Sequence, residues 1–232
     1  MPGLLHQRLD ELGIDFAVVY PTMGLGTTSI NNAADRAATC HAFNIFQAEQ
    51  FASFGDRMTP AAVIPMHTPA EAIAELDHAV GELGLKATMF GSLMMRPNPL
   101  LEDPDLALRF GWRDVVGLDS QYDYDPVWQH CVELGVVPTF HSGTRRAGLR
   151  TSPTNFVFNH IGHFAAANEA VCKALFLGGV TNRFPTLKFG FLEGGSSWAC
   201  QLLADLIEHW EKRSAHGLEA TRPTNLDVGT LM

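Results

Sequence analysis

Short apolar runs alternate with amphipathic segments along most of this chain. Runs that are almost continuously apolar are typical of strands buried on both faces, and the segments between them carry apolar residues at helical spacing. The runs predict strands at residues 14–20, 60–65, 85–90, 136–140 and 187–192. The amphipathic segments predict helices at residues 4–12, 31–54, 68–84, 126–134, 161–178 and 196–214.

This alternation predicts an α/β fold with a parallel sheet and helices outside it. Right-handed crossovers allow an open doubly wound sheet or a (β/α) barrel of the TIM type. No GxGxxG follows the first predicted strand, which counts against a dinucleotide-binding sheet. We therefore favour a barrel that is incomplete, with about five of the eight βα units that a closed one needs.

The remaining segments predict little regular structure. Residues 91–125 hold several prolines and are expected to form a long irregular insertion, and residues 145–159 a second loop. We expect residues 1–232 to form a single partial barrel domain with an irregular tail at 217–232.

Composition limits the classes of partner. The net charge of −9, from 25 acidic and 16 basic side chains, argues against nucleic acid or an anionic membrane as a partner. The apolar stretches are too short to span a bilayer, and the N-terminus has no signal-peptide pattern. The four cysteines have no CxxC spacing, as expected of reduced core residues, so we expect a cytoplasmic protein.

Two ionisable residues each follow an apolar run and precede glycine. His141 ends the run at 136–140, and Glu193 ends the run at 187–192. If both runs are parallel strands of one sheet, the two side chains lie on the same rim. His141 is then a candidate metal ligand and Glu193 a candidate acid or base. The alternatives are a histidine that caps a helix or bonds a carbonyl, and a carboxylate in a structural salt bridge.

Three further residues are candidates for binding substrate. Arg145 follows the His141 strand and could hold a carboxylate by paired hydrogen bonds, although it could equally be a solvated loop residue. His163 forms an HxxH with His160, a pattern that also arises by chance. Tyr20 ends the first predicted strand and could line the pocket.

Three stretches resemble a known family. Residues 9–22 (LDELGIDFAVVYPT), 137–143 (VPTFHSG) and above all 176–198 (FLGGVTNRFPTLKFGFLEGGSSW) are similar to the amidohydrolase superfamily. The branch is the one that contains aminocarboxymuconate-semialdehyde decarboxylase and γ-resorcylate decarboxylase. The resemblance implies a (β/α)8 barrel and one divalent metal ion, zinc in the first instance or manganese.

The family pattern also assigns expected roles. Its ion is held by a first-strand HxH or ExH, a fifth-strand histidine and an eighth-strand aspartate. His141 stands where the fifth-strand ligand would be, and Glu193 where several members place a catalytic histidine. The resemblance thus implies a metal-dependent hydrolase or non-oxidative decarboxylase of a small carboxylated, aromatic-derived substrate. It also implies a homodimer, because dimers are common in this branch.

The chain departs from that pattern at both ends. No counterpart of the first-strand HxH or the eighth-strand aspartate is present, so the resemblance covers strands two to six. We expect a fragment that binds metal weakly, if at all, and is inactive alone. A non-catalytic binding protein derived from the barrel stays open as an alternative, and an open nucleotide-binding sheet is a third.

Overall fold

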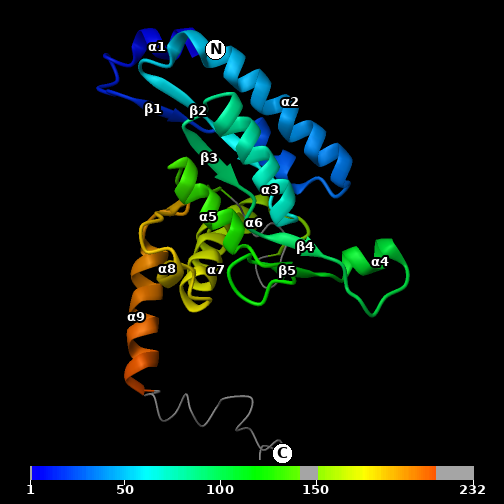
Figure 1. Ribbon diagram of the computed structural model, residues 1–232. Helices are drawn as coiled ribbons and strands as arrows, with labels where there is room; N and C mark the ends of the chain where they lie inside the picture. The colour runs from blue at the N-terminus through cyan, green and yellow to red at the C-terminus, as the bar shows by residue number, and fades with distance from the viewer. Residues whose placement is uncertain (1, 142–150, 213–232) are drawn as a thin grey trace, which may run out of the picture. The chain divides into compact units, whose positions relative to one another are not determined.

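The computed structural model describes residues 2–141 and 151–212 of the chain. It contains a five-stranded parallel sheet, whose first three strands can be followed in Figure 1. The strands are β1 (Ala17–Val19), β2 (Met58–Ile64), β3 (Ala87–Phe90), β6 (Pro138–Phe140) and β7 (Gly190–Phe191), in that spatial order. Every predicted strand is therefore present, although most are shorter than the apolar run that predicted them.

The strand order confirms the incomplete TIM-type barrel. Neighbours in the sheet follow one another along the chain, and each pair is parallel. A doubly wound sheet reverses its order at a switch point, where its ligand binds. The described sheet has no such reversal, which removes the open nucleotide-binding alternative.

Helices connect the strands. Those of the main body are α1 (Pro2–Arg8), α2 (Ala33–Phe51), α3 (Pro69–Leu76), α5 (Asp125–Leu134), α6 (Phe156–His160), α7 (His163–Leu177) and α8 (Val180–Arg183). Short 3-10 helices η1 (Met23–Ser29) and η2 (Ala52–Phe54) flank α2, and α3 continues into one π-helical stretch, η3 (Asp77–Glu82).

Local chemistry explains where these helices begin and end. The Thr68 side chain accepts a hydrogen bond from the backbone N–H of Glu71, and Pro69 occupies the first turn of α3. Gly135 ends α5 with φ +67°, a left-handed conformation that glycine adopts without strain. These are positions at which the sequence had predicted a start and a stop.

Alternate side chains of the strands enter different parts of the core. Ala62, Ile64 and Phe90 are fully or almost fully buried and pack with Leu76 and Trp128, from α3 and α5. Aromatic rings extend this cluster, with Phe90 and Phe140 edge to face at 6.3 Å. Burying such side chains stabilises the fold by about 1.5–3 kcal/mol each before the entropy cost is counted.

The side chain of Asn44 hydrogen bonds to β2 beyond the point where β1 ends. The Asn44 amide of α2 donates to the Val63 carbonyl at 3.0 Å and accepts from the Val63 N–H at 2.8 Å. Asn44 is fully buried, so it satisfies backbone groups that the shorter neighbouring strand leaves unpaired.

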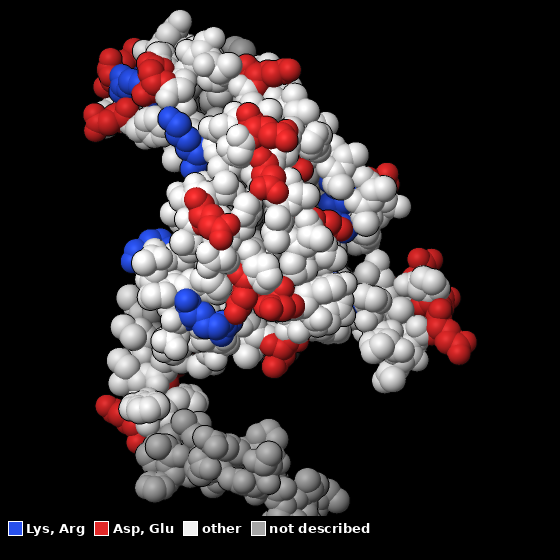
Figure 2. All heavy atoms as spheres, in the orientation of Figure 1, with Lys and Arg blue, Asp and Glu red and all other residues white. Residues whose placement is uncertain are grey.

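The segment predicted to be irregular contains a hairpin. β4 (Met94–Arg96) and β5 (Trp112–Asp114) pair antiparallel, and α4 (Pro104–Arg109) lies between them. Acidic side chains gather at the α4 end of this insertion (Figure 2). The prediction was wrong here because three-residue strands with Arg96 and Asp114 show no apolar alternation.

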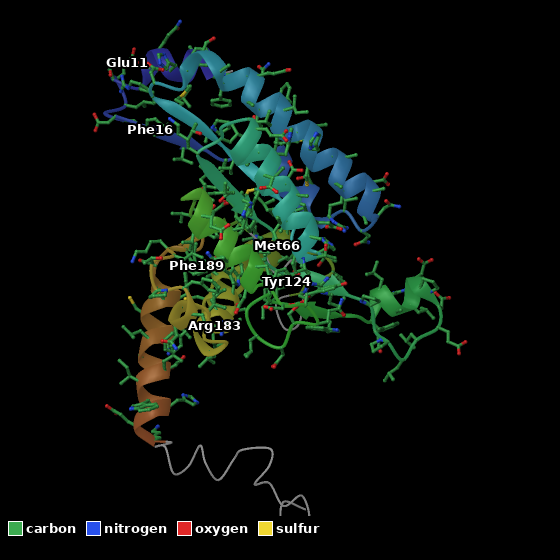
Figure 3. The ribbon with its side chains drawn as sticks, in the orientation of Figure 1. Glu11, Phe16, Met66, Tyr124, Arg183 and Phe189 are labelled. Carbon is green, nitrogen blue, oxygen red and sulfur yellow. The ribbon has the colours of Figure 1, made fainter. Side chains whose placement is uncertain are left out.

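A buried network fastens the hairpin to the end of β2. Arg96 donates to Asp114 at 2.8 Å, to the His67 carbonyl at 2.6 Å and to the Tyr124 hydroxyl at 2.8 Å. Tyr124 in turn donates to the Met66 carbonyl at 2.5 Å (Figure 3). Burial raises the pKa of Tyr124 to about 12, so its hydroxyl stays protonated and available as a donor.

The chain divides into two compact units, residues 1–194 and 195–232. The described part of the second contains α9 (Ser197–Lys212), whose Trp198 indole donates to the Gly195 carbonyl at 2.8 Å. The predicted tail at 217–232 lies outside the described residues. In the described ranges, no helix is both long enough and apolar enough to cross a membrane.

Candidate active site

Strand pairing brings His141 and Glu193 together at the carboxyl edge of the sheet. Phe140 of β6 is in register with Phe191 of β7, so the residues that follow leave the sheet at the same rim. The Nε2 atom of His141 lies 2.7 Å from the Oε2 atom of Glu193. The His141 side chain is 11% exposed and that of Glu193 52%, so the pair is reachable from solvent through the carboxylate.

Aromatic rings hold the His141 imidazole. Phe164 of α7 meets it edge-on with centroids 5.4 Å apart, and Tyr20 lies at 6.3 Å. Its Nδ1 atom is buried without a hydrogen-bond partner among the residues that the structure describes. Since Nε2 alone is paired there, the ring is oriented by packing and by Glu193.

The backbone of Glu193 is strained. Its φ is +60°, a left-handed conformation that costs a non-glycine residue about 1–2 kcal/mol. Two hydrogen bonds fix the preceding residue, from the Leu192 N–H to the Phe140 carbonyl at 3.0 Å and from the Asn168 amide to the Leu192 carbonyl at 2.9 Å. Strain held in place beside a rim is typical of functional positions.

Asn168 is therefore a candidate positioning residue, which sequence reasoning missed. It is 1% exposed on α7, and its amide reaches the residue before Glu193. A single amide on the buried stripe of an apolar helix is the signal that could have identified it, because a buried amide needs a partner.

Tyr20 lies beside His141, but its hydroxyl is engaged. It donates to Thr139 Oγ1 at 3.0 Å, and Thr139 donates in turn to the Thr88 carbonyl. These bonds run across β1, β6 and β3, so they stabilise the packing of the sheet. A role for Tyr20 in binding substrate stays a prediction, and its ring is the part available for it.

The other two predicted substrate contacts differ in placement. His163 begins α7 and is 5% exposed, with its ring 4.9 Å from His160 and 3.9 Å from Phe164. Phe164 also touches His141, so it is the residue through which His163 adjoins the rim pair. Arg145 lies outside the described residues.

The rim supplies few ligands for the metal ion that the sequence resemblance implies. His141 and Glu193 offer two candidate ligand atoms, whereas a catalytic zinc usually has three protein ligands. Within residues 2–141 and 151–212, the one group of three is His41, Glu75 and His78, on α2 and α3–η3. The described rim residues alone do not make a catalytic metal centre.

Comparisons with known proteins agree with the fold. A family model described as amidohydrolase matches residues 4–226. A curated 2-amino-3-carboxymuconate-6-semialdehyde decarboxylase from Dictyostelium discoideum is 29% identical over 135 residues, which are 58% of this chain and 32% of that protein.

Two solved structures illustrate the likeness. An amidohydrolase from Mycobacterium avium subsp. paratuberculosis superposes with a TM-score of 0.64 at 24% identity, covering 89% of this chain and 51% of that one. The second is a dihydroxybenzoic acid decarboxylase from a Polaromonas species, with bound manganese and the inhibitor 2-nitroresorcinol. It superposes with a TM-score of 0.61 at 19% identity, covering 82% of this chain and 53% of that one. The chain thus spans about half the length of these structures.

Proposed function

Because the chain belongs to the amidohydrolase family, we propose that it derives from a metal-dependent decarboxylase or hydrolase of small carboxylated, aromatic-derived compounds. Decarboxylation is the version we favour. Proteins of that activity recur among the relatives, and a curated one matches more than half of this chain.

The observation that carries the proposal is the pairing of His141 with Glu193. When an aromatic carboxylate loses CO2, the bonding electron pair stays on the ring carbon, which must then take up a proton. Glu193 is half exposed at the rim and its carboxylate lies 2.7 Å from the His141 ring, so it can hold a proton beside the substrate, deliver it to the ring carbon and take up another from solvent. Its strained backbone suits a residue held for chemistry more than for stability.

The proposal includes one divalent ion, zinc or manganese, with His141 as one ligand. Such an ion, when bound, supplies a positive charge that orients a carboxylate and stabilises developing negative charge. The remaining ligands are not among the described rim residues. We therefore propose that the 232-residue chain alone holds the ion weakly and turns over little substrate.

Metal content and activity test this function together. The 232-residue chain would be compared with a form extended at both ends, if the gene encodes one, using manganese, zinc and 2,6-dihydroxybenzoate with CO2 release as the readout. We expect rim metal and activity in the extended form and neither in the short one. If the extended form binds no ion at a site that includes His141 and releases no CO2 from any aromatic carboxylate tried, the proposal is wrong.

The rival function is a non-catalytic binding protein built on the same barrel. The limited number of ligands on the described rim favours it. An aromatic carboxylate that binds the chain without metal, and is not consumed by either form, would establish this alternative.

We also propose that two copies of the chain associate. Within the described sheet, β1 and β7 are each paired on one side only, and Phe16 and Val18 are both 46% exposed at β1. An unpaired, apolar edge favours association. Light scattering would give the mass, and Val18→Lys should shift it towards the monomer.

A further inference from the structure

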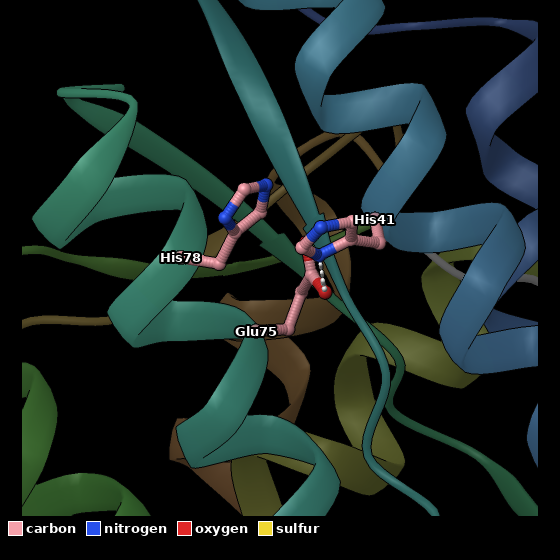
Figure 4. A group of neighbouring side chains, drawn as sticks. All are labelled: His41, Glu75 and His78. Atoms are coloured by element: carbon pink, nitrogen blue, oxygen red, sulfur yellow. Dashed lines mark ion pairs between the residues drawn. The ribbon is translucent and has the colours of Figure 1, made fainter.

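A second cluster of ligating side chains lies on the helices and away from the strand ends. His41 comes from α2, Glu75 from α3 and His78 from η3, and one ligand atom from each lies within 4.8 Å of the other two. The three side chains converge in the space between the helices (Figure 4). We propose that His41, Glu75 and His78 form a zinc site that ties α2 to α3.

Glu75 is a buried carboxylate with one oxygen incompletely satisfied. Its side chain is 7% exposed, and Oε1 accepts a hydrogen bond from the Asn44 amide at 2.6 Å. The Oε2 atom has His41 Nδ1 at 3.7 Å, which is too long for a hydrogen bond. A buried carboxylate is costly unless a counter-charge or a full set of hydrogen bonds holds it. A cation between the helices would supply that charge.

His78 has the arrangement of a metal-binding imidazole. Its Nδ1 atom lies 2.9 Å from Glu82 Oε2, and because a carboxylate accepts, Nδ1 carries the proton. The Nε2 atom is then left with a lone pair, and it is buried without a hydrogen-bond partner among the described residues. A carboxylate that orients one ring nitrogen while the other binds the ion is the usual outer-shell arrangement of histidine ligands.

His41 can complete the site with little rearrangement. Its side chain is 50% exposed, and its ring stacks on that of His78 with centroids 3.6 Å apart and planes 23° apart. In stacked rings the nitrogen lone pairs of His41 and His78 point in similar directions and do not meet at one point. One of the two rings must therefore turn before both can bind the same ion. The exposed His41 can do so by a rotamer change, which costs little on a surface.

The ligand types select the ion. Two imidazole nitrogens and one carboxylate oxygen suit zinc, whereas magnesium and calcium prefer oxygen alone. The cluster lines an open hollow whose other walls include Ala37, Ala38, Ala70 and Ala74. These small side chains leave room for water as a fourth ligand.

Zinc titration of the 232-residue chain carrying His141→Ala tests this site separately from the rim. We expect one equivalent of zinc to bind. His41→Ala or His78→Ala in the same background should weaken binding at least tenfold, and Glu82→Gln roughly tenfold through loss of the orienting bond.

His130→Ala is the matched control. His130 also lies on a helix beside acidic groups, but both its ring nitrogens face carboxylates, Asp77 at 2.8 Å and Glu133 at 3.4 Å. Zinc affinity should not change in this variant. Circular dichroism of each variant checks that the fold is kept.

Cobalt(II) provides a second measurement in the otherwise unchanged chain. We expect visible bands of a four-coordinate ion that disappear in His41→Ala and persist in His141→Ala. The proposal is overturned if the folded chain binds no zinc, or if binding and cobalt bands survive both His41→Ala and His78→Ala. Neither result bears on the rim, so the proposed function would stand or fall separately.

Discussion

His141 Nε2 lies 2.7 Å from Glu193 Oε2, although the two residues belong to different βα units. The contact exists because β6 and β7 are neighbours in register, so that the residues following Phe140 and Phe191 emerge together. The ends of adjacent parallel strands thus hold one ring and one carboxylate side by side, which is the arrangement that the proposed proton transfer uses.

Removal of the Glu193 charge should abolish most of the proposed turnover. In the extended protein, Glu193→Gln keeps the shape of the side chain but cannot exchange a proton. General acid–base groups contribute about 10²–10⁴-fold, so we expect kcat for decarboxylation to fall by that factor. Glu133→Gln, which alters a helix carboxylate next to His130, is the control and should leave kcat unchanged. An unaltered kcat in Glu193→Gln would exclude Glu193 as the proton donor.

Glycine should be tolerated better than alanine at position 193. Both substitutions remove the ion pair with His141, but only alanine retains the strain of φ +60°. We expect Glu193→Gly to be more stable than Glu193→Ala by about 1 kcal/mol in urea unfolding of the 232-residue chain. At Gln129, an exposed residue in the middle of α5, the order should reverse, because glycine weakens a helix interior by roughly 0.5–1 kcal/mol relative to alanine. If the alanine variant is as stable as the glycine variant at position 193, or more stable, the strain at Glu193 is contradicted.

Asp114→Ala should destabilise the chain strongly. Asp114 is fully buried and Arg96 is 4% exposed, so the substitution leaves a buried guanidinium without its counter-charge. We expect a loss of about 3–5 kcal/mol in the free energy of unfolding. Glu11→Ala removes an exposed partner of Arg8 and should cost no more than about 1 kcal/mol. If the two variants lose similar amounts, the Arg96 network does not fasten the hairpin.

His67 should make stability fall in mild acid. Burial lowers the pKa of His67 from 6.5 to about 4 in the folded chain, and the positive charge of the nearby Arg36 contributes to this shift. The unfolded chain therefore binds more protons between these values, and stability decreases as pH falls through that window. His67→Gln should flatten the decrease by on the order of 1–3 kcal/mol, since one pKa unit corresponds to about 1.4 kcal/mol. Parallel pH profiles of the two proteins in urea unfolding would contradict this.

The sequence by itself determined the positions of the five sheet strands and the boundaries of the longer helices. The short helices α4, α6 and α8 lie in segments where it predicted none, α6 mostly within the loop predicted at 145–159. A buried strand needs an apolar run, and a helix end needs a cap such as Thr68 or a left-handed glycine such as Gly135. Local residue patterns therefore predict these features. The placement of His141 and Glu193 on one rim follows in the same way, because parallel strands direct their carboxyl ends to one edge. The chemical roles of these two residues stay predictions.

Only the tertiary structure decided the β4–β5 hairpin and the cluster of His41, Glu75 and His78. The hairpin depends on a buried ion pair between Arg96 and Asp114, and the local sequence pattern does not predict that pair. The cluster depends on how α2 and α3 are rotated against each other, and each histidine alone resembles an ordinary surface residue. Contacts between segments distant in sequence determine both the hairpin and the cluster. The free energy that stabilises these contacts comes from tertiary packing and not from local propensity.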